Sequence, residues 1–98
     1  MEVEFFADGS NAREIMWNHG VKHGPYKYWY HTKVLGLDHN YKDDKLHGLC
    51  IERSLRGKKV MDCIYNNGKK DGLCRKWNEM GELTTIMYKD DVVVASME

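Results

Sequence analysis

The sequence predicts an all-β fold, a single elongated and twisted antiparallel sheet built from tandem β-hairpins. Three observations support this prediction. Glycine and aromatic residues recur at a fixed interval, short stretches of alternating character lie between them, and Asn-Gly, Asp-Asp and Arg-Gly turn signals separate those stretches. A chain of 98 residues with no shift in composition corresponds to one domain.

The interval is 24 residues, as the spacing of Gly24, Gly48 and Gly72 shows. Aromatic residues keep the same spacing, and the six positions in phase are Trp17, Gly24, Tyr41, Gly48, Tyr65 and Gly72. The predicted units are 2–17, 18–41, 42–65 and 66–88, followed by a C-terminal tail, 89–98, that begins a further copy and then departs from the pattern. A second series, Gly9, Gly57 and Gly81, has the same phase but is broken by Lys33. Tandem copies of one supersecondary unit are typical of a repeat protein.

Each unit is expected to contain two strands of ordinary length. The predicted strands are residues 24–30, 36–41, 48–54, 59–65, 72–78 and 83–88. If residues 55–58 close a hairpin, Gly48 lies opposite Tyr65. If residues 66–71 connect to the next strand, Tyr65 also lies opposite Gly72. Each aromatic ring would then cover a glycine on both sides, and the six in-phase positions would form one continuous row.

The pattern Y-x-x-G-K-x-x-G-x-x-x-x-W-x-x-x-G-x-L resembles the MORN (membrane occupation and recognition nexus) repeat superfamily. It is most similar to the divergent repeats of 23–24 residues in bacterial antitoxin-like proteins and giant-virus proteins. The residues that carry the resemblance in its best copy are Tyr65, Gly68, Lys69, Gly72, Trp77, Gly81 and Leu83. The chain departs from the pattern where Asp44 and Asp91 replace a turn glycine and Arg53 replaces the tryptophan. The resemblance implies a curved sheet used for binding or assembly, and no shared catalytic residue.

Three cysteines, Cys50, Cys63 and Cys74, fall in one row of this register. A disulfide from Cys63 to either Cys50 or Cys74 is geometrically allowed, and the two alternatives remain open. The odd count and the absence of a signal-like N-terminus favour reduced thiols in a cytosol-like compartment. A zinc site formed by these cysteines and His39 is disfavoured, because neighbouring strands are about 4.8 Å apart and four strands separate the ligands too widely.

The sequence does not predict an enzyme, a cofactor or a metal. The serines occupy no nucleophile-like context, and His23 and His47 are explained by repeat phase. The paired acids Asp43, Asp44, Asp90 and Asp91 are expected to be solvated turn residues rather than calcium ligands.

The segment YKYWY is the predicted binding region, because exposed tyrosine and tryptophan side chains concentrate binding energy. Alternation sends Tyr26, Tyr28 and Tyr30 to one face and Trp29 to the other. The candidate protein-binding residues are Tyr26, Tyr28, Trp29, Tyr30 and Trp77. The alternative is that these rings provide internal packing, with one face covered by the N-terminal segment or by residues 92–94.

The predicted role is protein–protein interaction or scaffolding, with self-assembly through the sheet ends as a further option. The resemblance implies a viral protein, as an assembly or virion component in the host cytoplasm, and the alternative is an antitoxin that neutralises a toxin by binding. The formal net charge of +0 disfavours nucleic-acid and membrane partners.

Overall fold

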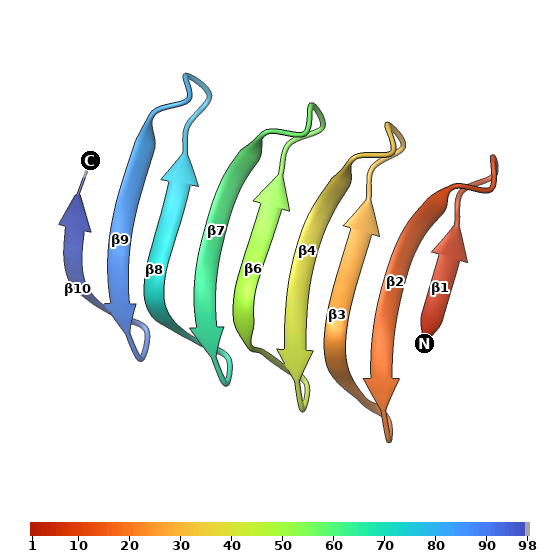
Figure 1. Cartoon of the computed structure of the whole chain (residues 1–98), viewed down its shortest axis with the longest axis horizontal. Helices are drawn as coiled ribbons and strands as arrows, with labels where there is room; N and C mark the ends of the chain where they lie inside the picture. Colours follow the sequence, from red (N-terminus) through yellow and green to blue (C-terminus); the bar gives the residue numbers. More distant parts are fainter. Residues whose placement is uncertain (98) are drawn as a thin grey trace.

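The computed structural model describes residues 1–97, so Glu98 of the predicted tail lies outside the described residues. Ten strands form one antiparallel sheet in the order β1-β2-β3-β4-β6-β7-β8-β9-β10, with β5 paired to β4 (Figure 1). The strands are β1 (Glu2–Phe5), β2 (Asn11–Asn18), β3 (Val21–Trp29), β4 (Leu35–Lys42), β5 (Lys45–Leu46), β6 (Gly48–Arg53), β7 (Lys59–Asn66), β8 (Lys69–Trp77), β9 (Leu83–Lys89) and β10 (Val92–Met97). The predicted all-β sheet of tandem hairpins is confirmed.

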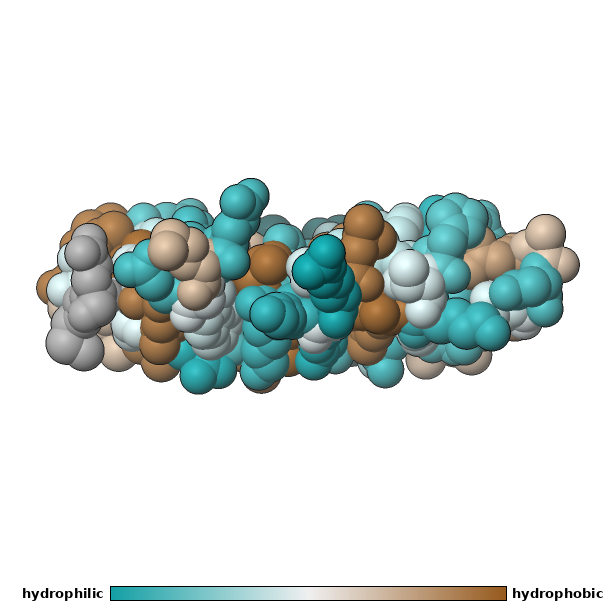
Figure 2. All heavy atoms as spheres, turned by 90° about the horizontal axis from the view of Figure 1, so that it is seen from above, coloured by the Kyte–Doolittle hydropathy of each residue, from teal (hydrophilic) through white to brown (hydrophobic). Residues whose placement is uncertain are grey.

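The sheet is a slab with principal extents of 43 × 36 × 10 Å. Apolar and polar side chains are intermixed on the slab, which is one sheet thick when seen from above (Figure 2). Among residues 1–97 no second layer covers either face. Among residues 1–96, whose burial the structure describes, the buried apolar residues are only Ile15, Cys50, Cys63 and Cys74. The fold therefore depends on strand pairing and on side chains that shield one another along the sheet.

Four longer loops join strands at one end of the sheet, and all four repeat the same hydrogen bonds. In the loop after β6, Ser54 N donates to Lys58 O at 2.8 Å and Gly57 N donates to Ser54 O at 2.9 Å. The third loop residue has a positive φ, which is 86° at Gly57 and 71° at Lys33. Lys33 therefore adopts the left-handed conformation of its glycine counterparts, and the loop keeps its shape without glycine.

Two-residue turns join strands at the other end. Both central residues have positive φ, as at Asn67 (51°) and Gly68 (87°), which is typical of a type I′ hairpin turn. These turns shorten the connection that the sequence analysis placed over residues 66–71. As a result β7 extends to Asn66 and β8 begins at Lys69, earlier than the predicted start at Gly72.

The tight turns make half of the predicted glycine–aromatic row wrong. Gly48 does lie opposite Tyr65, and Gly24 lies opposite Tyr41. On the turn side, however, the pairs are Trp17 with Lys22, Tyr41 with Leu46, and Tyr65 with Lys70.

The register shifts because β3 and β8 each carry a bulge between the preceding turn and the centre of the strand, and the in-phase glycines Gly24 and Gly72 lie in these bulges. Between the Cys63–Cys74 pair and the Tyr65–Lys70 pair, the single residue Ile64 faces three residues of β8 that include Gly72. Gly72 has φ +123°, a conformation that other residues rarely adopt. Each in-phase tyrosine therefore faces one glycine, across the longer-loop hairpin, rather than two.

The chain ends extend the sheet, so the expectation that one of them covers a face is wrong. β1 pairs with β2 and β10 pairs with β9, which makes them the two edge strands. Phe5 remains 62% exposed and Val94 60% exposed, as expected for side chains at an uncovered edge.

Candidate protein-binding surface

One face of the sheet carries a cluster of aromatic rings on β3 and β4, and we call it the tyrosine face. The ring centroids of Tyr26 and Tyr28 are 5.0 Å apart, and those of Tyr26 and Tyr41 are 5.1 Å apart. His39 lies directly opposite Tyr26, with 6.4 Å between the ring centroids. Because directly opposed residues share a face of a sheet, the register brings these four rings into one patch.

Cationic side chains from neighbouring positions border this patch. Lys22 Nζ is 5.2 Å from the ring centroid of Tyr26 and 5.0 Å from that of Tyr41, within the range of a cation–π interaction. Arg13 on β2 donates from Nη1 to the Tyr28 hydroxyl at 3.2 Å. The patch therefore combines aromatic surface with two positive charges.

Acidic residues of β1 hold Arg13 in place. Its Nη2 donates to Glu2 Oε2 at 2.8 Å and also to Glu4. Glu2 Oε1 accepts a further hydrogen bond, of 3.0 Å, from Trp17 Nε1. Strand β1 thus fixes the guanidinium that contacts the tyrosine cluster.

The two central tyrosines form a polarised pair. Tyr26 Oη donates to Tyr28 Oη at 3.0 Å. Burial, together with the hydrogen bond to Tyr28, raises the pKa of Tyr26 to about 12. The hydrogen bonds that Tyr28 accepts from Tyr26 and Arg13 lower its pKa. Burial also lowers the pKa of His39, so this imidazole tends to be neutral at pH 7. The arrangement presents hydroxyl groups and ring faces on one side of the sheet.

The five candidate binding residues separate into three environments. Tyr26 and Tyr28 lie together on the tyrosine face. Trp29 and Trp77 follow the alternation to the opposite face, where the Arg75 guanidinium stacks on the Trp77 ring at 5.2 Å. Tyr30 has an internal contact instead. Its ring covers Gly36, and its hydroxyl donates to Arg53 O at 2.7 Å.

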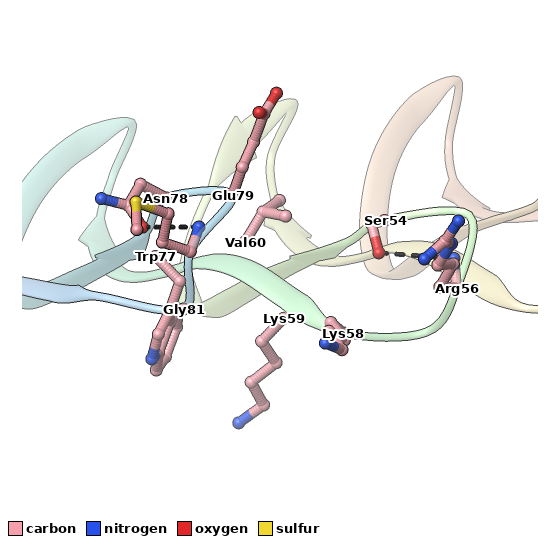
Figure 3. Close-up of a pocket in the computed structure, with 10 residues that line it drawn as sticks. Ser54, Arg56, Lys58, Lys59, Val60, Trp77, Asn78, Glu79 and Gly81 are labelled. Atoms are coloured by element: carbon pink, nitrogen blue, oxygen red, sulfur yellow. Dashed lines mark hydrogen bonds between the residues drawn. The ribbon is translucent and has the colours of Figure 1, made fainter.

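The two tryptophans line open hollows beside the longer loops. The larger hollow, of about 1080 Å³, lies between the loops that follow β6 and β8 and includes Arg56, Lys58 and Lys59 in its lining. Trp77 and Lys59 extend on the same side of the ribbon there (Figure 3). Trp29 lines a shallower hollow with Gly9, Ser10, Asn11 and Lys33. Both hollows are formed mainly by exposed loop residues.

The cysteine row continues the tyrosine face toward the C-terminus. Cys63 lies opposite both Cys50 and Cys74, as predicted, and the structure links it to Cys74. The expectation of three reduced thiols is therefore wrong for this pair, and Cys50 is the free cysteine. Burial raises the pKa of the Cys50 thiol, which makes it a weak nucleophile.

The acidic turns form backbone contacts. Asp44 Oδ1 accepts a hydrogen bond from Lys22 N at 2.7 Å, and Asp91 Oδ1 accepts one from Lys70 N at 2.7 Å. These carboxylates join neighbouring units. Within residues 1–97, no three side chains of His, Cys, Asp or Glu are grouped as metal ligands.

Sequence reasoning missed Arg13 as a member of the cluster, because its contact with Tyr28 crosses from β2 to β3, whose register shifts at a bulge. The described residues contain no helix long and apolar enough to cross a membrane.

No protein-family model matches the chain, and no curated protein matches it at a significant level.

Proposed function

We propose that this chain is a non-catalytic, MORN-like repeat protein that binds a protein partner through the tyrosine face. The observation that carries the proposal is the ring cluster of Tyr26, Tyr28 and Tyr41, bordered by Arg13 and Lys22, on a sheet with no second layer among residues 1–97. Tyrosine and arginine are enriched among residues that dominate binding energy at protein interfaces.

The biological role that we propose is scaffolding, as an assembly component of a virus particle. The support is the 24-residue phase of glycines and aromatics, together with the match of Tyr65–Leu83 to the MORN-like pattern. A single-layer sheet suits this role, since both faces and both edges are accessible to partners.

The test compares two adjacent residues on opposite faces. Tyr28→Ala removes a ring from the tyrosine face, and Trp29→Ala removes one from the other face without changing the strand. The partner is first identified by affinity capture and mass spectrometry, and its affinity for each variant is then measured by calorimetry. We expect Tyr28→Ala to weaken binding by about 30-fold, which corresponds to a hot spot of about 2 kcal/mol. We expect Trp29→Ala to bind as the wild type does.

Full binding by a Tyr26→Ala, Tyr28→Ala double variant would overturn the assignment of the tyrosine face. Co-purification with virus particles would support the scaffold role. Rescue of cells that express a toxin would replace the scaffold role with that of an antitoxin.

A further inference from the structure

The two edge strands resemble complementary parts of one complete strand. In the interior, β8 covers nine residues, Lys69–Trp77, and pairs with both of its neighbours. Strand β10 follows a two-residue turn and pairs Val93 with Tyr88, as Lys70 of β8 pairs with Tyr65. It therefore corresponds to the first part of β8.

Strand β1 corresponds to the second part. It precedes a longer loop and pairs Glu2 with Ile15, as Cys50 of β6 pairs with Cys63. Figure 1 shows β1 beside the loop end of β2 and β10 beside the turn end of β9. At the turn end of β2, Trp17 and Asn18 have no partner strand on their outer side among residues 1–97. The free edge at one end of the sheet thus matches the strand segment at the other end.

A ladder of hydrogen bonds between units indicates how these edges would join. Each later two-residue turn donates a backbone N–H to the strand of the preceding unit. The bonds run from Asp44 N to Lys22 O (2.9 Å), from Gly68 N to Leu46 O (2.8 Å) and from Asp91 N to Lys70 O (2.8 Å). The first turn, His19–Gly20, has no preceding unit within residues 1–97, and Val93, which corresponds to Lys70, has no following turn. Gly20 N–H and Val93 C=O are therefore the donor and the acceptor that would continue the ladder.

The side chains at the β10 edge favour association. Val92, Val93 and Val94 are 62%, 54% and 60% exposed. Residues 92–96 of this strand include neither a charged residue nor a proline. Edge strands commonly carry such residues, which prevent pairing with the edge of another sheet. On the β1 side, the carboxylates of Glu2 and Glu4 are both bonded to Arg13, which reduces their charge at that edge.

We propose that a second copy of this chain is a partner, bound head to tail. The outer edge of β10 in one copy pairs with the free turn end of β2 in the next, and Gly20 N–H donates to Val93 C=O. Strands β10 and β1 supply six and four residues where β8 has nine. The register places Ser96 and Met97 at the positions that Glu2 and Val3 also occupy, so the joint has to displace two residues. The contact joins two different surfaces, so it continues as an open series of copies. This inference rests on the proposed scaffold function and names one partner for it.

The first experiment blocks the β10 edge. By analogy with Lys70, whose N–H and C=O both bond to the adjacent turn, Val93 directs both groups outward. Val93→Pro keeps the C=O and the ladder with β9, but it places the proline ring at the outer edge, where the ring blocks the approach of β2 and Gly20. Val93→Thr is the matched control, because it keeps the N–H and a β-branched side chain. In sedimentation velocity at rising protein concentration, we expect the wild type and Val93→Thr to form a series of species beyond dimers. We expect Val93→Pro to remain monomeric, with a wild-type circular dichroism spectrum.

The second experiment tests direction. A Val93→Pro chain still has the free edge of β2 to which β10 of a wild-type chain can bind. It would therefore end a growing series of copies, and adding it to the wild type should shorten the assemblies. In a symmetric dimer of two β10 edges it would have no effect. Gly20→Asp should strengthen assembly, because an aspartate at the equivalent position, Asp44, accepts the N–H of Lys22.

A wild type that is monomeric at all concentrations, or one that stops at dimers, would overturn the inference. A folded Val93→Pro variant that assembles as the wild type does would also overturn it. Tyr28→Ala should assemble normally, and Val93→Pro should keep its affinity for a partner of the tyrosine face. Failure of assembly and failure of the proposed partner binding can therefore be distinguished.

Discussion

Tyr26 faces His39 across β3 and β4, whereas Cys50 faces Cys63 at the equivalent place across β6 and β7. The backbone register is the same in the two halves of the sheet, but the side chains differ in size and exposure. The N-terminal half presents half-buried rings with polar groups, and the C-terminal half has three cysteines that are at most 2% exposed. Turns and bulges therefore fix the backbone of each unit. The side chains on the faces can vary from unit to unit, so one half of the sheet can carry buried packing residues and the other half exposed rings.

The halves also differ on the opposite face. In the C-terminal half, Asp62 is 3% exposed and accepts two hydrogen bonds from Arg75. Arg75 Nε donates to Asp62 Oδ1 at 2.9 Å, and Nη2 donates to Oδ2 at 2.5 Å. In the N-terminal half, Asp38 takes the place of Asp62, but it is less buried, and the residue that faces it in the place of Arg75 is the uncharged Ile51. The charged residue opposite Asp38 is Lys27, which lies on the other neighbouring strand, β3. The C-terminal half thus has a largely buried ion pair where the N-terminal half has a more exposed carboxylate.

The largest expected effect is the loss of this ion pair. Asp62→Ala should lower the free energy of unfolding by about 2 kcal/mol, below the 3–5 kcal/mol typical of fully buried pairs, because the sheet is thin and Arg75 keeps access to water. Asp38→Ala is the matched control and should change stability by less than about 1 kcal/mol. Urea unfolding measures both values, and equal losses would remove the distinction between the halves.

The same pair predicts a pH dependence. Hydrogen bonds from Arg75 lower the pKa of Asp62, so its contribution is complete above about pH 4, the ordinary pKa of an unfolded aspartate, and is lost as the pH falls through the lowered folded value. Stability of the wild type should therefore decrease in acid more steeply than stability of Asp62→Ala. Parallel pH profiles would contradict this cause.

The bulge glycines should differ between the halves as well. A Cβ at Gly72 would lie 3.4 Å from Ile64 Cβ, whereas one at Gly24 would lie 3.4 Å from the flexible Met16 Cγ. Both glycines have positive φ, so both alanine variants are strained. Both Cβ distances are ordinary van der Waals distances, so the backbone decides the order: the φ of Gly72 (+123°) lies farther than that of Gly24 (+106°) from the left-handed region that other residues can adopt. We expect Gly72→Ala to cost about 1.5 kcal/mol and Gly24→Ala about 1 kcal/mol. Thermal unfolding of the two variants tests the order.

A smaller and opposite effect is expected in the loops. Lys33 occupies a left-handed position that Gly57 fills in the next unit. Lys33→Gly should raise the free energy of unfolding by about 1 kcal/mol by relieving this strain. Lys33→Ala keeps a Cβ and should give no gain, and the reciprocal Gly57→Lys should cost a similar amount. A stabilising alanine variant would indicate a cause other than backbone strain.

Much of this fold follows from the repeat. The period predicted the strands, the Gly48–Tyr65 register and the shared face of Tyr26 and Tyr28. The pairing of Tyr65 with the following strand could not be predicted. A two-residue Asn-Gly turn followed by a bulge involves the same residues as a single longer loop, and the sequence does not distinguish the two. The cysteine pairing was open because Cys63 lies opposite two cysteines. The covering of Gly36 by Tyr30 also had no signal, since it depends on how the chain turns after β3.

The smallest effect concerns the pKa of the tyrosine pair. Burial is the first cause of the raised pKa of Tyr26, and the hydrogen bond to Tyr28 is the second. Tyr28→Phe removes the hydrogen bond and keeps the ring, so the pKa of Tyr26 should fall from about 12 by only part of its shift. Tyr65, in the C-terminal half, has its pKa raised first by burial and should be unaffected. Carbon NMR titration of labelled tyrosine rings resolves the two residues. A shift of Tyr65 together with Tyr26 would show that the halves are coupled, whereas an unchanged Tyr26 would show that burial alone sets its pKa.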